Sequence, residues 1–227
     1  MSRLQYTTES KLIRVMCSGR VDLSFVLRAF SNGIDGVFIG GCRFNECNYA
    51  THGNYHALSM VLLLKKIMEH IGLNPQRLRI ENMSSGEGTL FAEVMSEFGN
   101  QVKQLGPLGK GEGIDENALK SKLEAVTNLV PYIRLVERER LRVPFKSEQD
   151  IIKFFTSDKF NSLFDETVGE KLAISQIISL LREGPLTTGE IAKGLDLTPS
   201  EVSRHLNSSS RQRFVRYDEG LKCYALA

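Results

Sequence analysis

Two cysteines lie in one glycine-rich stretch of the chain. Cys42 and Cys47 are separated by four residues and directly follow Gly40 and Gly41. Glycines allow the backbone to turn tightly and to direct N–H groups at sulfur, so such a loop can place two thiolates on one metal ion or cluster. Free cysteines also pack as small buried hydrophobic residues, and the spacing alone leaves both interpretations open.

Strands and helices are predicted to alternate in the first hundred residues, and this alternation brings a third cysteine toward the loop. Short apolar runs predict strands at residues 12–16, 36–39 and 78–80, and helices are predicted at residues 21–30, 55–71 and 90–98. This alternation implies a parallel sheet with right-handed crossovers. Cys17 directly follows the first run and Cys42 follows the second. Ligands bind at the carboxyl ends of such strands, so we expect the cysteines to meet there.

Other polar residues lie near these strand ends. His52 and His56 precede and begin a predicted helix, and either is a candidate ligand or hydrogen-bond donor, or a polar residue on a partly exposed turn. The loop at residues 84–88, Ser-Ser-Gly-Glu-Gly, can cap the following helix or bind an anion at its N-terminus. It lacks the lysine and the spacing of a phosphate-binding P-loop.

The composition excludes several classes of protein. The chain has 227 residues, 41% hydrophobic residues, a formal net charge of +2 and four cysteines, which argues against a disordered tail and against a disulfide scaffold. The longest apolar run, residues 57–64, is interrupted by Ser59 and is far shorter than the roughly 20 residues of a membrane helix. The first residues lack the pattern of a secretory signal. We therefore expect a cytoplasmic protein without a membrane span, with reduced thiols.

The middle of the chain changes character twice. Residues 106–113, Gly-Pro-Leu-Gly-Lys-Gly-Glu-Gly, are typical of a linker or mobile loop. Residues 115–165 predict a helical connector, in which the charged stretch at 136–142 faces solvent or a partner.

The C-terminal part predicts a winged helix-turn-helix. Residues 172–181 form an amphipathic pattern, and two capping boxes follow, the first from Thr187 to Glu190 and the second from Thr198 to Glu201. The third helix is expected at residues 199–209. Two strands at residues 214–217 and 222–226, separated by Asp-Glu-Gly, would form the wing.

This helix-turn-helix raises the possibility of DNA binding. The third helix offers Ser200, Ser203, Arg204 and Asn207 to a groove, and Arg211, Arg213, Arg216 and Lys222 are available for phosphates. Residues 171–227 contain eight Lys plus Arg and six Asp plus Glu, so their net charge is only 8 − 6 = +2. DNA-binding domains usually carry a larger basic excess, and winged helices also dock proteins. A redox-responsive DNA-binding regulator is thus the alternative to a docking role.

Four stretches, in order, resemble the delta subunit of methyl-viologen-reducing hydrogenases. They are residues 14–22 (RVMCSGRVD), residues 36–47 with both loop cysteines, Gly53-Asn54, and residues 79–88 (RIENMSSGEG). The resemblance implies an iron–sulfur electron-transfer subunit, in which Cys17, Cys42 and Cys47 bind a two-iron two-sulfur (2Fe-2S) cluster. The sequence itself shows no constellation of a catalytic acid, base or nucleophile. It implies partners on both sides: a hydrogenase, formate dehydrogenase or flavin oxidoreductase, and a heterodisulfide-reductase-type flavin subunit.

The chain departs from that family in two ways. Arg43 and Asn48 stand where the family usually has histidine, which would alter hydrogen bonding and charge around a cluster. Family members also begin with a further strand and a Cys-Asn-x-Cys turn before the stretch at residues 2–6. We expect a reading frame truncated at a selenocysteine codon, which an in-frame UGA upstream would reveal. A fourth ligand would otherwise come from a partner chain or from Cys223, which we interpret as an ordinary buried cysteine of the wing.

These observations predict an α/β fold. We expect a small open parallel sheet with flanking helices in an iron–sulfur domain at residues 1–105, a linker and helical connector at residues 106–165, and a winged helix-turn-helix at residues 166–227.

Overall fold

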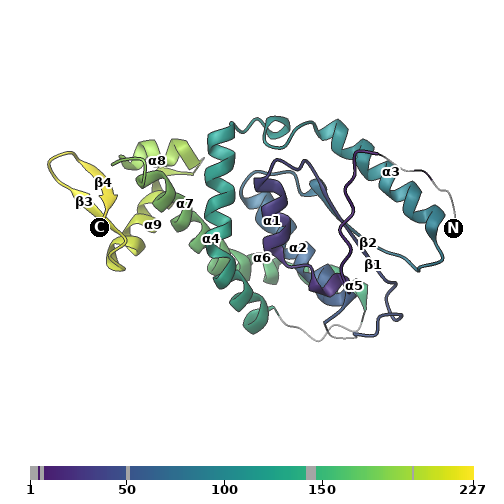
Figure 1. Cartoon of the computed structure of the whole chain (residues 1–227). Helices are drawn as coiled ribbons and strands as arrows, with labels where there is room; N and C mark the ends of the chain where they lie inside the picture. Colours follow the sequence, from purple (N-terminus) through teal and green to yellow (C-terminus); the bar gives the residue numbers. More distant parts are fainter. Residues whose placement is uncertain (1–4, 6–7, 50–51, 142–146, 196) are drawn as a thin grey trace. The chain divides into compact units, whose positions relative to one another are not determined.

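The computed structural model describes residues 5, 8–49, 52–141, 147–195 and 197–227 (Figure 1). The chain divides into two compact units, one made of Met1–Leu119 and Arg142–Asn161, the other of Lys120–Leu141 and Ser162–Ala227. The predicted domain boundaries at residues 105 and 165 stay predictions.

The first unit is built on two parallel strands. β1 (Val37–Gly41) pairs with β2 (Leu78–Asn82), with Val37 opposite Leu78 and Gly41 opposite Asn82. The helices of this unit are α1 (Leu23–Ser31), α2 (Asn54–His70), α3 (Gly88–Leu105) and α5 (Glu148–Phe155). α2 connects the two strands and contacts β2, α1 and α5. This arrangement confirms the predicted small parallel sheet flanked by helices.

Capping and apolar burial explain the helices beside the sheet. The Asp22 carboxylate accepts the Ser24 N–H (2.8 Å) and caps α1. Along α2, Ala57, Val61 and Leu64 are fully buried. Burying each large aliphatic side chain stabilises the fold by about 1.5–3 kcal/mol, so α2 forms the centre of this core.

The strand predicted at residues 12–16 is wrong. The segment lies in no strand of the described structure, and its large side chains point to solvent, with Leu12 66%, Ile13 87% and Met16 99% exposed. Strand-forming side chains specify a strand only where a neighbouring strand supplies hydrogen bonds and packing. Within the described residues no strand pairs with this segment.

The glycine-rich residues 106–113 are tied to the first unit through Arg77. This side chain is fully buried, and its guanidinium donates to the carbonyl oxygens of Gly106 (2.8 Å) and Leu105 (3.3 Å) and to the Glu112 carboxylate (3.1 Å). The Glu112 carboxylate also accepts the Gly109 N–H (2.9 Å) across a short 3₁₀ helix, Lys110–Glu112. The glycine content that suggested a mobile loop gave no sign of this buried anchor.

The second unit holds the helix-turn-helix. Its elements include most of α4 (Glu116–Arg140), the end of α6 (Asp158–Phe164), a π-helical turn (Asp165–Gly169), α7 (Glu170–Leu181), α8 (Thr188–Leu195), α9 (Pro199–Arg211), β3 (Val215–Asp218) and β4 (Cys223–Leu226). Ile177, Ile191 and Leu206 form the centre of its core. α7, α8 and α9 followed by the hairpin confirm the predicted winged helix-turn-helix.

Both predicted capping boxes are present. Thr198 donates its N–H to the Glu201 carboxylate (2.9 Å), and the Thr198 hydroxyl accepts the Glu201 N–H (3.3 Å). Thr187 and Glu190 make the same pair of contacts, at 2.8 and 3.3 Å. The two boxes fix where α8 and α9 begin.

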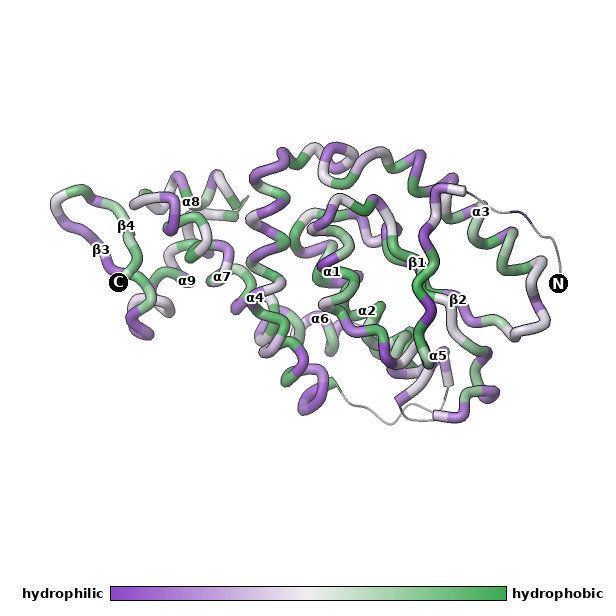
Figure 2. Tube along the Cα trace, viewed as in Figure 1, coloured by the Kyte–Doolittle hydropathy of each residue, from purple (hydrophilic) through white to green (hydrophobic). Residues whose placement is uncertain are grey.

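The wing is an antiparallel hairpin whose two strands differ in hydropathy. Asp218 lies opposite Cys223, and β4 is coloured as hydrophobic whereas β3 is largely hydrophilic (Figure 2). Cys223 is only 6% exposed, as expected for a cysteine that packs in a core.

Among the helices of the described ranges, none is both long and apolar enough to cross a membrane.

Candidate metal centre

Three cysteines meet at the carboxyl end of β1. Cys42 directly follows β1, and Cys17 precedes a short 3₁₀ helix, Ser18–Arg20, that contacts β1 and α2. The Cys47 sulfur accepts hydrogen bonds from the thiols of Cys42 and Cys17. The structure therefore brings together the three cysteines that the sequence singled out. They meet as hydrogen-bonded thiols: within the described residues, no group of three or more His, Cys, Asp or Glu side chains is already arranged as a metal site.

The thiols of Cys42 and Cys47 differ in acidity. Burial raises the pKa of Cys42, and its hydrogen bond to Cys47 raises it further. Burial also acts to raise the pKa of Cys47, but hydrogen bonds from the Asn54 and Tyr49 N–H groups and from the two neighbouring thiols lower it below the ordinary cysteine value. Because the thiolate is the metal-binding form, Cys47 is better prepared to bind a metal than Cys42.

Glycines leave room for the cysteines. A Cβ on Gly53 would lie 2.2 Å from the Cys47 sulfur, and one on Gly19 would lie 2.0 Å from the His52 carbonyl oxygen. A Cβ on Gly41 would lie 2.9 Å from the side-chain oxygens of both Ser18 and Asn82. The loops after β1 and β2 and before α1 therefore approach one another at distances that only glycine permits.

Asn54, the first residue of α2, holds the cysteine loop in place. Its side chain is fully buried, and its amide nitrogen donates to the carbonyl oxygens of Cys42 (3.0 Å) and Arg43 (2.9 Å). The same nitrogen lies 3.8 Å from the Cys42 sulfur. One buried side chain thus fixes the backbone beside Cys42 and directs an N–H group at its sulfur.

Side chains on both sides hold the rest of the loop. The Phe44 ring packs on Tyr55 of α2 with centroids 4.8 Å apart. The Arg43 guanidinium pairs with the Glu87 carboxylate, which also accepts the Ser84 N–H (2.7 Å). A carboxylate therefore occupies the turn at residues 84–88, where the sequence suggested a cap or an anion site. These contacts, first the Ser84 N–H and then Arg43, lower the pKa of Glu87.

The N-terminal half of the chain matches a known family. Residues 1–106 match the family described as "Methyl-viologen-reducing hydrogenase, delta subunit". An iron-sulfur subunit of the F420-non-reducing hydrogenase of Archaeoglobus profundus is 46% identical over 105 residues, which cover 46% of this chain and 76% of that protein. The chain belongs to this delta-subunit family. The vhc iron-sulfur subunit of the F420-non-reducing hydrogenase of Methanococcus voltae is 40% identical over 107 residues, 47% of this chain and 74% of that protein.

Another relative of this delta-subunit chain is much longer. It belongs to the ferredoxin/F420H2-dependent CoB-CoM heterodisulfide reductase of Methanosarcina acetivorans and is 44% identical over 109 residues, 48% of this chain. The match spans only 14% of that protein. At the other end of the chain, residues 175–217 match the family described as "Bacterial regulatory protein, arsR family".

A small hollow lies beside the cysteines of the delta-subunit segment. It measures about 230 Å³ and is lined by Cys17, Gly19, Arg20, Tyr49, His52 and His56. Both histidines that the sequence suggested as ligands or donors thus lie near Cys17, and their part in any site stays a prediction.

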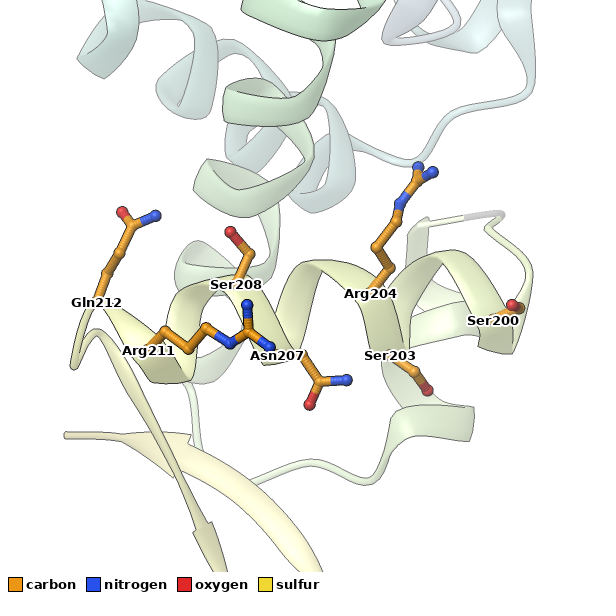
Figure 3. A pocket seen from close by; sticks show the side chains of 7 residues that line it. All are labelled: Ser200, Ser203, Arg204, Asn207, Ser208, Arg211 and Gln212. Atoms are coloured by element: carbon orange, nitrogen blue, oxygen red, sulfur yellow. The ribbon is translucent and has the colours of Figure 1, made fainter.

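A second hollow follows the exposed face of α9. It measures about 580 Å³ and is lined by Ser200, Ser203, Arg204, Asn207, Ser208, Arg211 and Gln212. Figure 3 shows these side chains projecting from α9 and from the residue after it. The four residues that the sequence proposed for a DNA groove therefore share one surface, and Arg211 adds a second guanidinium two turns after Arg204.

Sequence reasoning gave no role to the residues that hold the loop, although Gly53-Asn54 is one of the stretches that resemble the delta-subunit family. Asn54 follows a glycine and begins an apolar helix, a pattern typical of an N-cap, but its side chain bonds to a loop twelve residues earlier. No spacing pattern in the sequence predicts the contact between Phe44 and Tyr55.

Proposed function

We propose that this chain is an electron-transfer subunit that holds an iron–sulfur cluster through Cys17, Cys42 and Cys47. The observation that carries the proposal is the meeting of these three thiols, from two separate segments, at the end of β1. Membership of the delta-subunit family supports it, because relatives in that family are named iron-sulfur subunits. The 2Fe-2S type is part of the proposal.

The thiol ligands of the site and the absence of a side chain at Gly53 suit an iron–sulfur cluster. Thiolates are the usual ligands of iron–sulfur clusters, and hydrogen bonds to sulfur tune their potential. Here the Asn54 and Tyr49 N–H groups hydrogen-bond to the Cys47 sulfur, and Gly53 presents no Cβ to it. A 2Fe-2S cluster takes four ligands, so the three cysteines would be completed by one ligand from elsewhere. When bound, the cluster would supply one-electron redox chemistry.

The proposed partners are other oxidoreductase subunits. One side is a hydrogenase, formate dehydrogenase or flavin oxidoreductase, and the other is a heterodisulfide-reductase-type flavin subunit. Support comes from relatives of both kinds, one named for a hydrogenase and one for a heterodisulfide reductase. The protein's residues would orient the thiols and exclude water from the side where the buried Asn54 side chain contacts Cys42.

Anaerobic stopped-flow spectroscopy tests this function. Protein purified without oxygen and loaded with iron and sulfide is mixed with reduced methyl viologen, and the visible absorption is followed. We expect bleaching as the chain accepts an electron, lost in Cys42→Ser and retained in Cys223→Ser, which changes a buried cysteine of the wing. A chain that retains iron but is not reduced would overturn the relay, and bleaching unchanged in Cys42→Ser would overturn the site.

A specific observation also favours DNA binding by α9 as a second function. The basic excess of this region is small, but two of its six acidic residues, Glu190 and Glu201, are engaged in capping boxes. The hollow along α9 contains two guanidinium groups and no carboxylate. The distribution of charge is therefore more favourable to phosphate than the net charge of +2 suggests.

Gel shifts with the chain's own promoter DNA over a salt series test this second function. Arg204→Ala should weaken binding and reduce the salt slope by about one, because one phosphate contact is lost. Arg182→Ala is the matched control, since Arg182 is exposed on the same unit but pairs with Glu124 (3.4 Å). If Arg204→Ala and Arg182→Ala weaken binding equally, or if no gel shift is seen at low salt, DNA binding by α9 is contradicted.

A further inference from the structure

An ion pair with two parallel hydrogen bonds joins the cysteine loop to the turn at residues 84–88. Arg43 directly follows Cys42, and its Nε donates to one oxygen of the Glu87 carboxylate (2.9 Å), while a terminal guanidinium nitrogen donates to the other oxygen. The first oxygen also accepts the Ser84 N–H (2.7 Å). Such a bidentate pair has a defined geometry, which the single ammonium group of a lysine does not reproduce. The pair therefore fixes the direction as well as the separation of the two loops.

Arg43 is held at both of its ends. Its carbonyl oxygen accepts a hydrogen bond from the Asn54 side-chain amide (2.9 Å), whose nitrogen also donates to the Cys42 carbonyl oxygen (3.0 Å). Its side chain is held by Glu87, the residue immediately before α3, whereas Asn54 is the first residue of α2. One residue thus connects the cysteine loop to the beginnings of two helices.

The pair also places a matched cation and anion next to a proposed cluster ligand. The Arg43 side chain is 52% exposed and the Glu87 side chain 26% exposed, and their opposite charges cancel while both are present. Reduction adds a negative charge to a cluster, so a nearby cation raises its reduction potential and a nearby anion lowers it. Loss of either partner would therefore leave an unmatched charge of known sign.

We propose that Arg43 is a positioning residue of the cysteine site. Its pair with Glu87 fixes the loop that carries Cys42 and Cys47, and the Glu87 carboxylate cancels the charge of the guanidinium that follows Cys42. The fixed loop is a property of the metal-free chain. The effect on the reduction potential rests on the proposed electron-transfer function.

Hydrogen exchange of the metal-free, full-length chain tests the fixed loop. We expect the amides of residues 42–47 to exchange about fivefold faster in Arg43→Gln and in Glu87→Gln, a factor in the range of an exposed ion pair of good geometry. Arg43→Lys should also accelerate exchange, because an ammonium group does not form both hydrogen bonds. Lys66→Gln is the matched control, since it removes one partner of an ion pair within α2 (Lys66 to Glu69, 3.9 Å) and should leave the loop unchanged.

Redox titration followed by electron paramagnetic resonance tests the role of the charges. The loaded chain and its variants are titrated anaerobically at low ionic strength, where charges are least screened. Glu87→Gln should shift the potential upward, because the guanidinium is then unmatched. Arg43→Gln should shift it downward, because the carboxylate is then unmatched, whereas Arg43→Lys keeps the charge and should stay close to wild type. A role confined to the shape of the loop would not give opposite signs in Glu87→Gln and Arg43→Gln.

Two results would overturn the proposal. The first is unchanged exchange of residues 42–47 in Arg43→Gln, which would make the pair an ordinary surface ion pair. The second is a pair of potential shifts of the same sign in Arg43→Gln and Glu87→Gln, or no shift in either. A wild-type chain that binds no iron would overturn the electron-transfer function and, with it, the effect on the potential, while the exchange experiment on metal-free protein would still decide the fixed loop.

Discussion

The contacts that stabilise the inside of each unit differ greatly in how far apart their residues lie in the sequence. In the second unit, the capping boxes of α8 and α9 join residues three positions apart. In the first unit, Arg77 reaches Glu112 over 35 positions, and the Leu108 N–H reaches the Asp35 carboxylate over 73. The unit with local signals can be derived from sequence patterns, whereas the unit with the cysteine site depends on contacts that no local pattern encodes.

The cysteines show the same difference. Cys223 is buried in β4, where it packs as a small apolar side chain. Cys17, Cys42 and Cys47 are partly exposed and hydrogen-bonded to one another. The same residue type therefore serves packing in one unit and can serve chemistry in the other, and the surroundings decide which.

The largest expected effect comes from the buried cation of the first unit. Arg77→Ala should cost about 3–5 kcal/mol in free energy of unfolding, because it leaves the Glu112 carboxylate and several carbonyl oxygens without their donor. Urea unfolding followed by circular dichroism measures the change. Arg182→Ala breaks an exposed pair in the second unit and should cost less than about 1 kcal/mol. Equal costs would break the contrast between the two units.

A smaller effect is expected from the glycine beside Cys47. Gly53→Ala should cost about 1–3 kcal/mol and disturb the thiol cluster, because the new Cβ would overlap the Cys47 sulfur. Gly189→Ala in α8 is the control, since nothing lies within 4 Å of its added Cβ, and it should stabilise by up to about 1 kcal/mol. Thiol titration with a chromogenic reagent reports the site, and unchanged thiol reactivity in Gly53→Ala would contradict the close packing described.

Removal of a local cap should have a moderate effect. Thr198→Ala should lower the stability of the second unit by about 1 kcal/mol, because the Glu201 N–H loses its acceptor at the start of α9. Thermal unfolding measures the loss, and Thr198→Ser, which keeps the hydroxyl, should restore most of it. A loss as large as that of Arg77→Ala would mean that caps do not act locally here.

The smallest expected effect is a dependence on acid. Burial acts to raise the pKa of Glu112, but Arg77 and the Asn74 and Gly109 N–H groups lower it below the ordinary value. A lowered folded-state pKa adds stability above the unfolded pKa, near 4.5, and this stability is lost as the pH falls through the folded pKa. The protection factors of residues 105–113 against hydrogen exchange, which are corrected for the intrinsic pH dependence of amide exchange, should therefore fall as the pH is lowered below the unfolded pKa. Protection factors that are equally low at pH 7 would contradict an anchored segment.

The sequence accounts for much of the fold and for part of the site. Apolar runs predicted β1, β2 and the helices beside them, and capping residues predicted α8 and α9. Because Cys17 and Cys42 each follow an apolar run, the sequence predicted that the cysteines lie at one edge of the sheet. The segment at residues 12–16 was mispredicted because a strand needs a partner as well as suitable side chains. Asn54 and Arg77 were missed because their function comes from carbonyl groups distant in sequence.

Iron bound per chain tests the central claim most directly. Wild-type protein and the four single variants Cys17→Ser, Cys42→Ser, Cys47→Ser and Cys223→Ser are loaded anaerobically, and iron and sulfide are measured alongside low-temperature electron paramagnetic resonance. We predict that each of the first three variants loses most of its iron and the signal, and that Cys223→Ser retains both. Retention of iron in Cys42→Ser and Cys47→Ser, or equal loss in Cys223→Ser, would contradict a cluster held by the three cysteines at the end of β1.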